Sequence, residues 1–193
     1  NSLLLSIFFV LKTITIINLM KRVIKLTESE LTNLIKKVIN ENTLSGSRYD
    51  VVFVGGLEND MGLSSQTNLL NRGLGGKNIK SFSHGAPTSS VLEFMKQNLK
   101  LPVYLFSAGC KKAADLSASP YVNKYKLYLI EPYLASKITM NIVKQAISNG
   151  VPTSNVFSGP YPGRGLGING STKTPKGYDQ YGALTFAAAE TSR

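Results

Sequence analysis

From residue 49 onward, short apolar runs alternate with polar or glycine-containing loops and with stretches of helical periodicity. Five runs rich in β-branched and aromatic residues are predicted strands: Val51 to Val54, Ile79 to Phe82, Val103 to Phe106, Leu127 to Ile130, and one that begins at Val156. Nearly continuous apolar strands separated by helices are typical of a parallel sheet with both faces covered. The pattern therefore predicts an α/β fold, with an open, mostly parallel sheet between two layers of helices.

Helices are predicted wherever apolar residues recur at intervals of three and four between the strands. The predicted helices are residues 88–99, residues 110–116, a segment through Ile138, Ile142 and Ile147 that ends at Gly150, and residues 183–189. Each comes after a strand and its loop, as expected for a chain that winds from strand to helix and back.

The chain before residue 49 is predicted to divide into three parts. Residues 1–19 form an apolar run, interrupted by the charged Lys12, that is about long enough to cross a bilayer as a helix. Because the first methionine is Met20, the run is either sequence translated upstream of the true start, a membrane anchor or signal, or a core element. Residues 42–48 are predicted to be a linker, which leaves residues 49–193 as the α/β domain.

Residues 20–41 are predicted to contain an amphipathic leader helix. Thr27 and Glu30 have the spacing of a capping box, and apolar residues then recur on one face up to Ile39. The segment resembles amino-terminal leaders of tailed-phage proteins, which implies a cytoplasmic or virion-associated protein, anchored in a membrane only if residues 1–19 are genuine. The apolar stripe of helix 27–41 must be buried, so we expect a protein partner, a membrane surface, or the chain's own domain to cover it.

Composition narrows the class of protein. The chain is 42% hydrophobic and 17% charged, which is ordinary for a globular domain. A single cysteine, Cys110, and a single histidine, His84, exclude a disulfide scaffold and a Cys/His zinc site within the chain, and no metal or other cofactor is expected. The net charge is +11, but the basic residues form no run interleaved with aromatic residues, so we predict a solvated basic surface and no specific nucleic-acid partner.

The candidate chemistry lies in the loops after the strands, because the carboxyl ends of parallel strands form the ligand side of an open α/β sheet. Ser107 follows the third strand and precedes a predicted helix. Ala108 and Gly109 suit a strained turn that exposes a nucleophilic serine, although Leu105 stands where that motif has its first glycine. Ser107 is therefore either a nucleophile or a small residue required by a tight turn.

Over residues 49–160 the order of these elements resembles the α/β-hydrolase superfamily. The resemblance implies a serine hydrolase acting on a small-molecule or polymeric ester or amide, with Ser107 as the nucleophile and Glu131 or Asp179 as the acid. The backbone N–H groups that bind the oxyanion in this family would belong to three small residues: Gly55, Gly56 and Ala108.

His84 is the candidate general base, and its place in the sequence is unusual for that role. Ser83-His84-Gly85 resembles a histidine–glycine turn of the family, but the family's general base lies near the carboxyl terminus, where this sequence has no histidine. A serine hydroxyl is a poor nucleophile without a base. His84 is expected about two strand spacings, or about 10 Å, from Ser107. The alternatives are a histidine beyond Arg193, a His84 that swings toward Ser107 from its neighbouring loop, or an inactive, hydrolase-like phage protein targeted by its leader.

Three further features have weaker chemical interpretations. The glycine-rich segment 159–170, with Arg164, is predicted to be either an anion-binding nest or a flexible loop. Residues 73–77, GLGGK, lack the spacing and the following Ser or Thr of a phosphate-binding loop. Cys110 is either a reactive thiol at a helix start or a buried small apolar residue.

Overall fold

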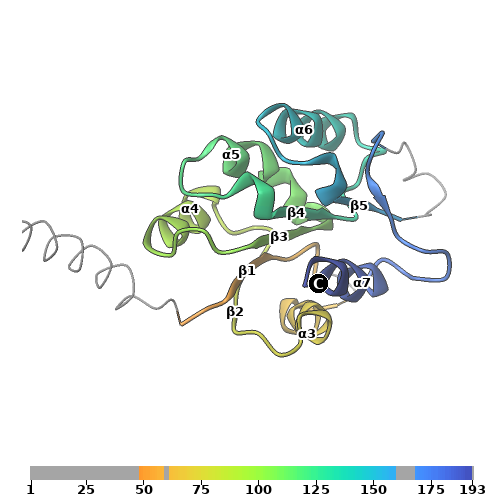
Figure 1. Cartoon of the computed structure of the whole chain (residues 1–193), viewed down its shortest axis with the longest axis horizontal. Helices are drawn as coiled ribbons and strands as arrows, with labels where there is room; N and C mark the ends of the chain where they lie inside the picture. The colour runs from red at the N-terminus through yellow and green to blue at the C-terminus, as the bar shows by residue number, and fades with distance from the viewer. Residues whose placement is uncertain (1–47, 59–60, 160–167, 193) are drawn as a thin grey trace, which may run out of the picture. The chain divides into compact units, whose positions relative to one another are not determined.

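The computed structural model describes residues 48–58, 61–159 and 168–192, and in this part of the chain six strands form one parallel sheet (Figure 1). The strands are β1 (Val51–Val54), β2 (Ile79–Phe82), β3 (Val103–Phe106), β4 (Leu127–Ile130), β5 (Val156–Ser158) and β6 (Thr172–Lys173). The helices are α3 (Leu63–Leu74), α4 (Thr88–Gln97), α5 (Ala113–Ala118), α6 (Lys137–Ser148) and α7 (Gly182–Thr191), with 3-10 helices η1 (Ser107–Lys112), η2 (Lys124–Lys126) and η3 (Thr153–Asn155). The predicted α/β class is confirmed. The apolar segment and the leader helix lie outside the described residues.

The strands are arranged in the order β2-β1-β3-β4-β5-β6, and every neighbouring pair is parallel. After β1 the chain passes to β2 on one side, and it then returns across β1 to β3 on the other side. The direction of winding therefore reverses between β1 and β3. The loops that follow these two strands open a crevice at the carboxyl edge of the sheet.

Helices cover both faces of the sheet because the strand side chains point alternately to the two faces. Val52 and Val54 of β1 belong to a core with α4, α5 and α6, whereas Val51 and Phe53 belong to a core with α3 and α7. Figure 1 shows the same division, with α3 and α7 side by side on one face. The sheet is thus the middle of three layers.

The predicted strand ends agree with the first four observed strands, and the fifth strand begins at Val156 as predicted. Helix α4 ends at Gln97, two residues earlier than predicted. The predicted helix 110–116 is divided between η1 and α5, because the chain turns sharply at Ser107 and continues in the tighter 3-10 geometry. In the described part of the chain, no helix has both the length and the apolar character needed to cross a membrane.

Helix α3 was not predicted from the sequence. Its sequence is rich in Ser and Asn and contains Gly73, all of which lower helix propensity. Gly73 has a packing role, since a Cβ there would overlap the Thr185 carbonyl oxygen and the Ala188 side chain of α7. The helix buries Leu70 and Leu74. Tertiary packing therefore outweighs local propensity in this segment.

Strand β6 was also not predicted. It is two residues long and has no apolar run, and it pairs with β5 through Phe157 opposite Thr172 and Ser158 opposite Lys173. A short polar edge strand of this kind has no distinctive sequence pattern.

Candidate functional site

A cavity of about 440 Å³ lies at the carboxyl ends of the central strands. Its lining comes from the loop after β1, from η1 after β3, and from the segment between β4 and the first turn of α6. The lining residues are Leu57, Ser107, Ala108, Lys111, Tyr133, Ser136 and Thr139. We call it the Ser107 cavity. It lies where the winding direction of the sheet reverses, which is the usual ligand position in open α/β sheets.

Ser107 occupies a strained turn at the wall of this cavity. It follows β3 directly, and its φ of +48° is in the left-handed region that residues other than glycine rarely adopt. The turn packs tightly on the end of β1, since a Cβ at Gly109 would come within 2.6 Å of the Val54 carbonyl oxygen and 2.7 Å of the Gly55 carbonyl oxygen. The structure therefore has the tight strand-to-helix turn predicted for this serine.

The amides of Gly55 and Gly56 are both already hydrogen-bonded. The Gly55 N–H donates to the Phe82 carbonyl oxygen at 2.9 Å, and the Gly56 N–H donates to the Gln66 side-chain Oε1 at 2.8 Å. The geometry therefore does not support their expected role as oxyanion donors. Ala108 differs, because it lies in the first turn of η1, where backbone N–H groups have no partner within the helix.

Gln66 is a structural residue of this site that the sequence analysis missed. Its side chain is fully buried, and its amide nitrogen donates to the carbonyl oxygens of Leu57 at 3.1 Å and Met61 at 2.7 Å. Together with the bond from Gly56, these contacts tie the loop after β1 to α3. Only a glycine fits at position 56, because a Cβ there would lie 2.9 Å from the Ser107 Cβ.

His84 is separated from Ser107 by a whole strand. It lies in a turn after β2, where the Ala86 N–H donates to the Ser83 carbonyl oxygen at 3.1 Å. Because β1 lies between β2 and β3, the two loops are two strand spacings apart, about 10 Å. Within the described residues no hydrogen bond joins His84 to Ser107, and the buried Nδ1 of His84 has no partner. The structure does not bring the two predicted catalytic residues together.

Glu131 lies on the other side of Ser107 from His84. It follows β4, is 2% exposed, and has a left-handed φ of +48°. Its Oε1 accepts a hydrogen bond of 3.1 Å from the Thr174 hydroxyl, and its carboxylate packs so closely on Gly159 that a Cβ there would overlap it. Both neighbours follow strands β5 and β6. The carboxylate therefore points away from β2 and cannot orient His84.

Asp179 and Arg164 are the two remaining residues that the sequence predicted for the site. Asp179, the alternative acid, accepts a hydrogen bond of 2.5 Å from the N–H of Gly182, the first residue of α7. Arg164 lies outside the described residues, and anion binding by its segment stays a prediction.

Cys110 is a buried thiol. Its Sγ donates to the carbonyl oxygens of Leu105 at 3.2 Å and Ile130 at 3.7 Å. Burial raises the pKa of the Cys110 thiol far above its usual range, and the nearby Glu131 charge adds to the increase. The neutral thiol is therefore held in the core, which agrees with the buried alternative rather than a reactive thiolate.

Ser136 and Thr139 are further residues of the cavity that the sequence analysis missed. Ser136 is the N-cap of α6, and its hydroxyl oxygen accepts a long hydrogen bond of 3.5 Å from the Thr139 N–H. Thr139 is 1% exposed, and its Oγ1 has no hydrogen-bond partner in the described part of the chain. A serine before an apolar helix signals a cap, but nothing in the sequence shows which loop that cap faces.

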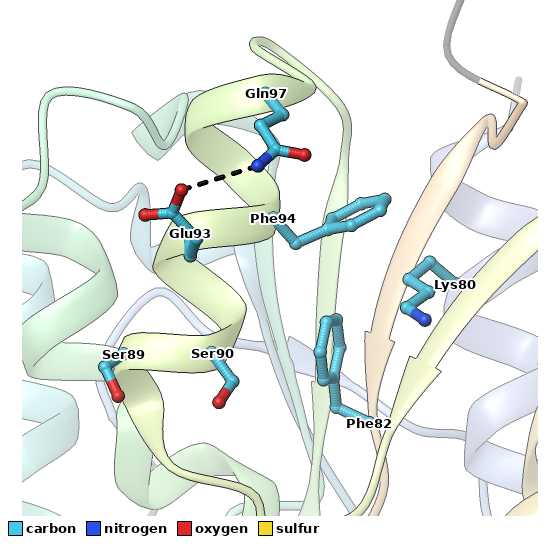
Figure 2. Close-up of a pocket in the computed structure, with 7 residues that line it drawn as sticks. All are labelled: Lys80, Phe82, Ser89, Ser90, Glu93, Phe94 and Gln97. Atoms are coloured by element: carbon cyan, nitrogen blue, oxygen red, sulfur yellow. Dashed lines mark hydrogen bonds between the residues drawn. The ribbon is translucent and has the colours of Figure 1, made fainter.

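A larger hollow of about 600 Å³ lies elsewhere, between the edge strand β2 and α4. Figure 2 shows Phe82 and Phe94 side by side in it, with Lys80 beside them. The Lys80 Nζ is 5.4 Å from the Phe82 ring centre and 5.8 Å from that of Phe94, as in cation–π packing. The hollow is far more open than the Ser107 cavity, and it lies beside the sheet edge rather than at the carboxyl ends of the strands. We therefore assign the site to the Ser107 cavity.

The described residues contain no group of three or more His, Cys, Asp or Glu side chains that could hold a metal ion. Comparison of the chain with known proteins finds no matching family model, no matching curated protein and no matching solved structure.

Proposed function

We propose that the chain binds a small molecule in the Ser107 cavity, on a hydrolase-like domain without a working catalytic triad. The observation that supports this most directly is the position of the cavity, at the point of the sheet where open α/β folds hold ligands. The separation of His84 from Ser107 by β1 argues against catalysis through that pair.

The test is a screen of small fragments against the ¹⁵N-labelled chain. Binding is expected to shift the backbone amide signals of Ser107, Ala108 and Thr139. Ala108→Leu, which fills the cavity, should abolish the shifts. Ala118→Leu, an exposed position on α5, is the matched control and should leave them unchanged. Shifts confined to the groove between β2 and α4, or no shifts at all, would refute the proposal.

A serine hydrolase acting on an ester or amide is the second candidate. The strained, left-handed backbone of Ser107 favours it, because nucleophilic serines at strand-to-helix turns share that strain. The test is labelling with a fluorophosphonate, followed by peptide mapping. Labelling at Ser107 that is lost in Ser107→Ala would establish an activated serine. No labelling, beside a hydrolase that reacts, would favour binding without catalysis.

The third part of the proposal concerns the predicted leader helix and rests on sequence alone. We infer that residues 20–41 deliver the domain to a virion or to a partner protein. Deleting residues 1–41 should then abolish that association and leave fragment binding unchanged. A deletion that changes neither would remove the leader from the proposal.

A further inference from the structure

We propose that the Ser107 cavity binds an oxyanion, a carboxylate or phosphate group, carried by a small apolar body. This inference rests on the function proposed above and names the class of ligand. Three features of the cavity support it: the Thr139 hydroxyl, which is buried and has no partner among the described residues, the first turn of α6, and Lys111 at the cavity wall.

The Thr139 hydroxyl provides the most direct argument. The residue lines the cavity and is 1% exposed, yet its Oγ1 makes no hydrogen bond to any described residue. Buried polar groups in proteins nearly always have a partner, and leaving one unpaired is unfavourable. The Oγ1 itself is covered in this structure, so a small rotation of the Thr139 side chain would bring its hydroxyl to the cavity, where a ligand oxygen would accept its hydrogen bond.

The first turn of α6 adds donors and a favourable field. This helix has 12 residues, and Ser136 and Thr139 bring its amino-terminal end to the cavity wall. The first backbone N–H groups of a helix lack partners within the helix, and the helix dipole favours negative charge at that end. Among the described residues, the Ser136 hydroxyl accepts one long bond from the Thr139 N–H, and it still has a proton to donate.

Charge complementarity also favours an anion. Lys111 is the one charged residue among the described residues that line the cavity, and no acidic side chain lines it. Its exposed ammonium group would attract an anion to the entrance more than it would add binding energy, because solvent screens it.

The apolar part of the cavity lining indicates that the part of the ligand beyond its oxyanion is apolar. Leu57, Ala108 and Tyr133 contribute apolar surface to the lining, and Leu57 and Tyr133 are 52% and 48% exposed. A cavity of about 440 Å³ has far more room than one oxyanion needs. An apolar body the size of an aromatic ring would cover these side chains while its oxyanion reaches Thr139.

The experiment compares four probes by isothermal titration of the full chain: benzoate, phenyl phosphate, benzamide and inorganic phosphate. We expect benzoate or phenyl phosphate to bind at least tenfold more tightly than benzamide, which has the same shape without the charge. The better of the two anions identifies the ligand as a carboxylate or a phosphate. Inorganic phosphate should bind more weakly than phenyl phosphate because it lacks the apolar body.

Variants connect the binding to the named residues. Thr139→Val should weaken binding of the anionic probe about tenfold, the equivalent of one buried hydrogen bond. Lys111→Gln should weaken it about threefold, whereas Lys144→Gln, which removes a charge from an exposed position of α6, should have no effect.

The outcomes separate this inference from the proposed function. Equal binding of benzamide and benzoate, with the amide shifts still at the cavity, would overturn the oxyanion and leave a small-molecule site. Anion binding that Thr139→Val does not change would overturn the assignment to this cavity. If no probe binds and the fragment screen also finds nothing, both proposals fail.

Discussion

The Gly56 N–H donates a buried hydrogen bond of 2.8 Å to the Oε1 of Gln66, ten residues along the chain. This bond joins the loop after β1 to helix α3. It lies next to Ser107, because Gly56 packs against the Ser107 side chain. The Gln66 amide nitrogen also donates to two carbonyl oxygens of the same loop. The Gln66 side chain therefore holds in place the loop that forms one wall of the cavity. It also occupies the Gly56 N–H, which the resemblance to α/β-hydrolases would assign to the oxyanion.

Gln66→Met should destabilise the protein by about 2–3 kcal/mol, because it keeps the side-chain volume and leaves a buried N–H and two carbonyl oxygens without their partner. Urea unfolding monitored by circular dichroism would measure the loss. Ser65→Ala, at the exposed neighbouring position of α3, is the control and should change stability by less than about 0.5 kcal/mol. Equal midpoints for Gln66→Met and the wild type would show that these bonds do not hold the loop.

Gly109→Ala should destabilise the protein by about 1–3 kcal/mol through overpacking. The added methyl group would meet the carbonyl oxygens of Val54 and Gly55, which are backbone atoms and cannot rotate away. The matched control is Gly85→Ala, where the nearest atom to an added Cβ is 3.9 Å away. Thermal unfolding would compare the two variants. Similar melting temperatures would mean that η1 is not packed against β1 as described.

The strands could be predicted because their pattern is local. Each central strand of a parallel sheet is buried on both faces, so an apolar run such as 103–106 marks its own ends. Helix α3 has no such local signal, since Gly73 is explained only by α7, more than a hundred residues later. The same limit applies to β6, whose two polar residues are a strand only because β5 lies beside them.

The candidate site could be predicted in position but not in detail. Parallel strands bring their carboxyl ends to one edge, so the loop that carries Ser107 was expected at a cavity. The engagement of the Gly56 amide by Gln66, and the approach of Thr139 to the same cavity, depend on how α3 and α6 pack against the sheet. Periodicity predicts that a helix exists, but not which of its polar residues faces a neighbouring loop.

The buried Cys110 thiol should make the protein less stable as the pH rises above about 8.5, the ordinary pKa of a cysteine. Burial raises the pKa of the folded thiol, so in this range the unfolded chain loses its proton while the folded chain keeps it. The free energy of unfolding should then fall by up to about 1.4 kcal/mol per pH unit from this group.

Urea unfolding at pH 7.5, 8.5 and 9.5 would measure this slope as the difference between the wild type and Cys110→Ala, which cancels the groups that both proteins share. Tyr104 does not interfere, because its pKa is raised to about 12 by burial and its ordinary value is already near 10. A difference that is constant with pH would mean that the thiol is not buried in the folded protein.

Thr139→Val should leave stability unchanged or raise it by about 1 kcal/mol, because it replaces a buried hydroxyl that has no partner among the described residues by a methyl group of the same shape. The matched substitution is Thr185→Val, which removes a hydroxyl that donates to the Leu69 carbonyl oxygen at 3.1 Å and should destabilise by about 1 kcal/mol. Urea unfolding of both variants measures the contrast. If Thr139→Val is as destabilising as Thr185→Val, the Thr139 hydroxyl has a partner within the protein and is not reserved for a ligand. If Thr139→Val instead stabilises the protein while Thr185→Val destabilises it, and Thr139→Val also weakens binding of the anionic probe, the Thr139 hydroxyl contributes to ligand binding at a cost in stability.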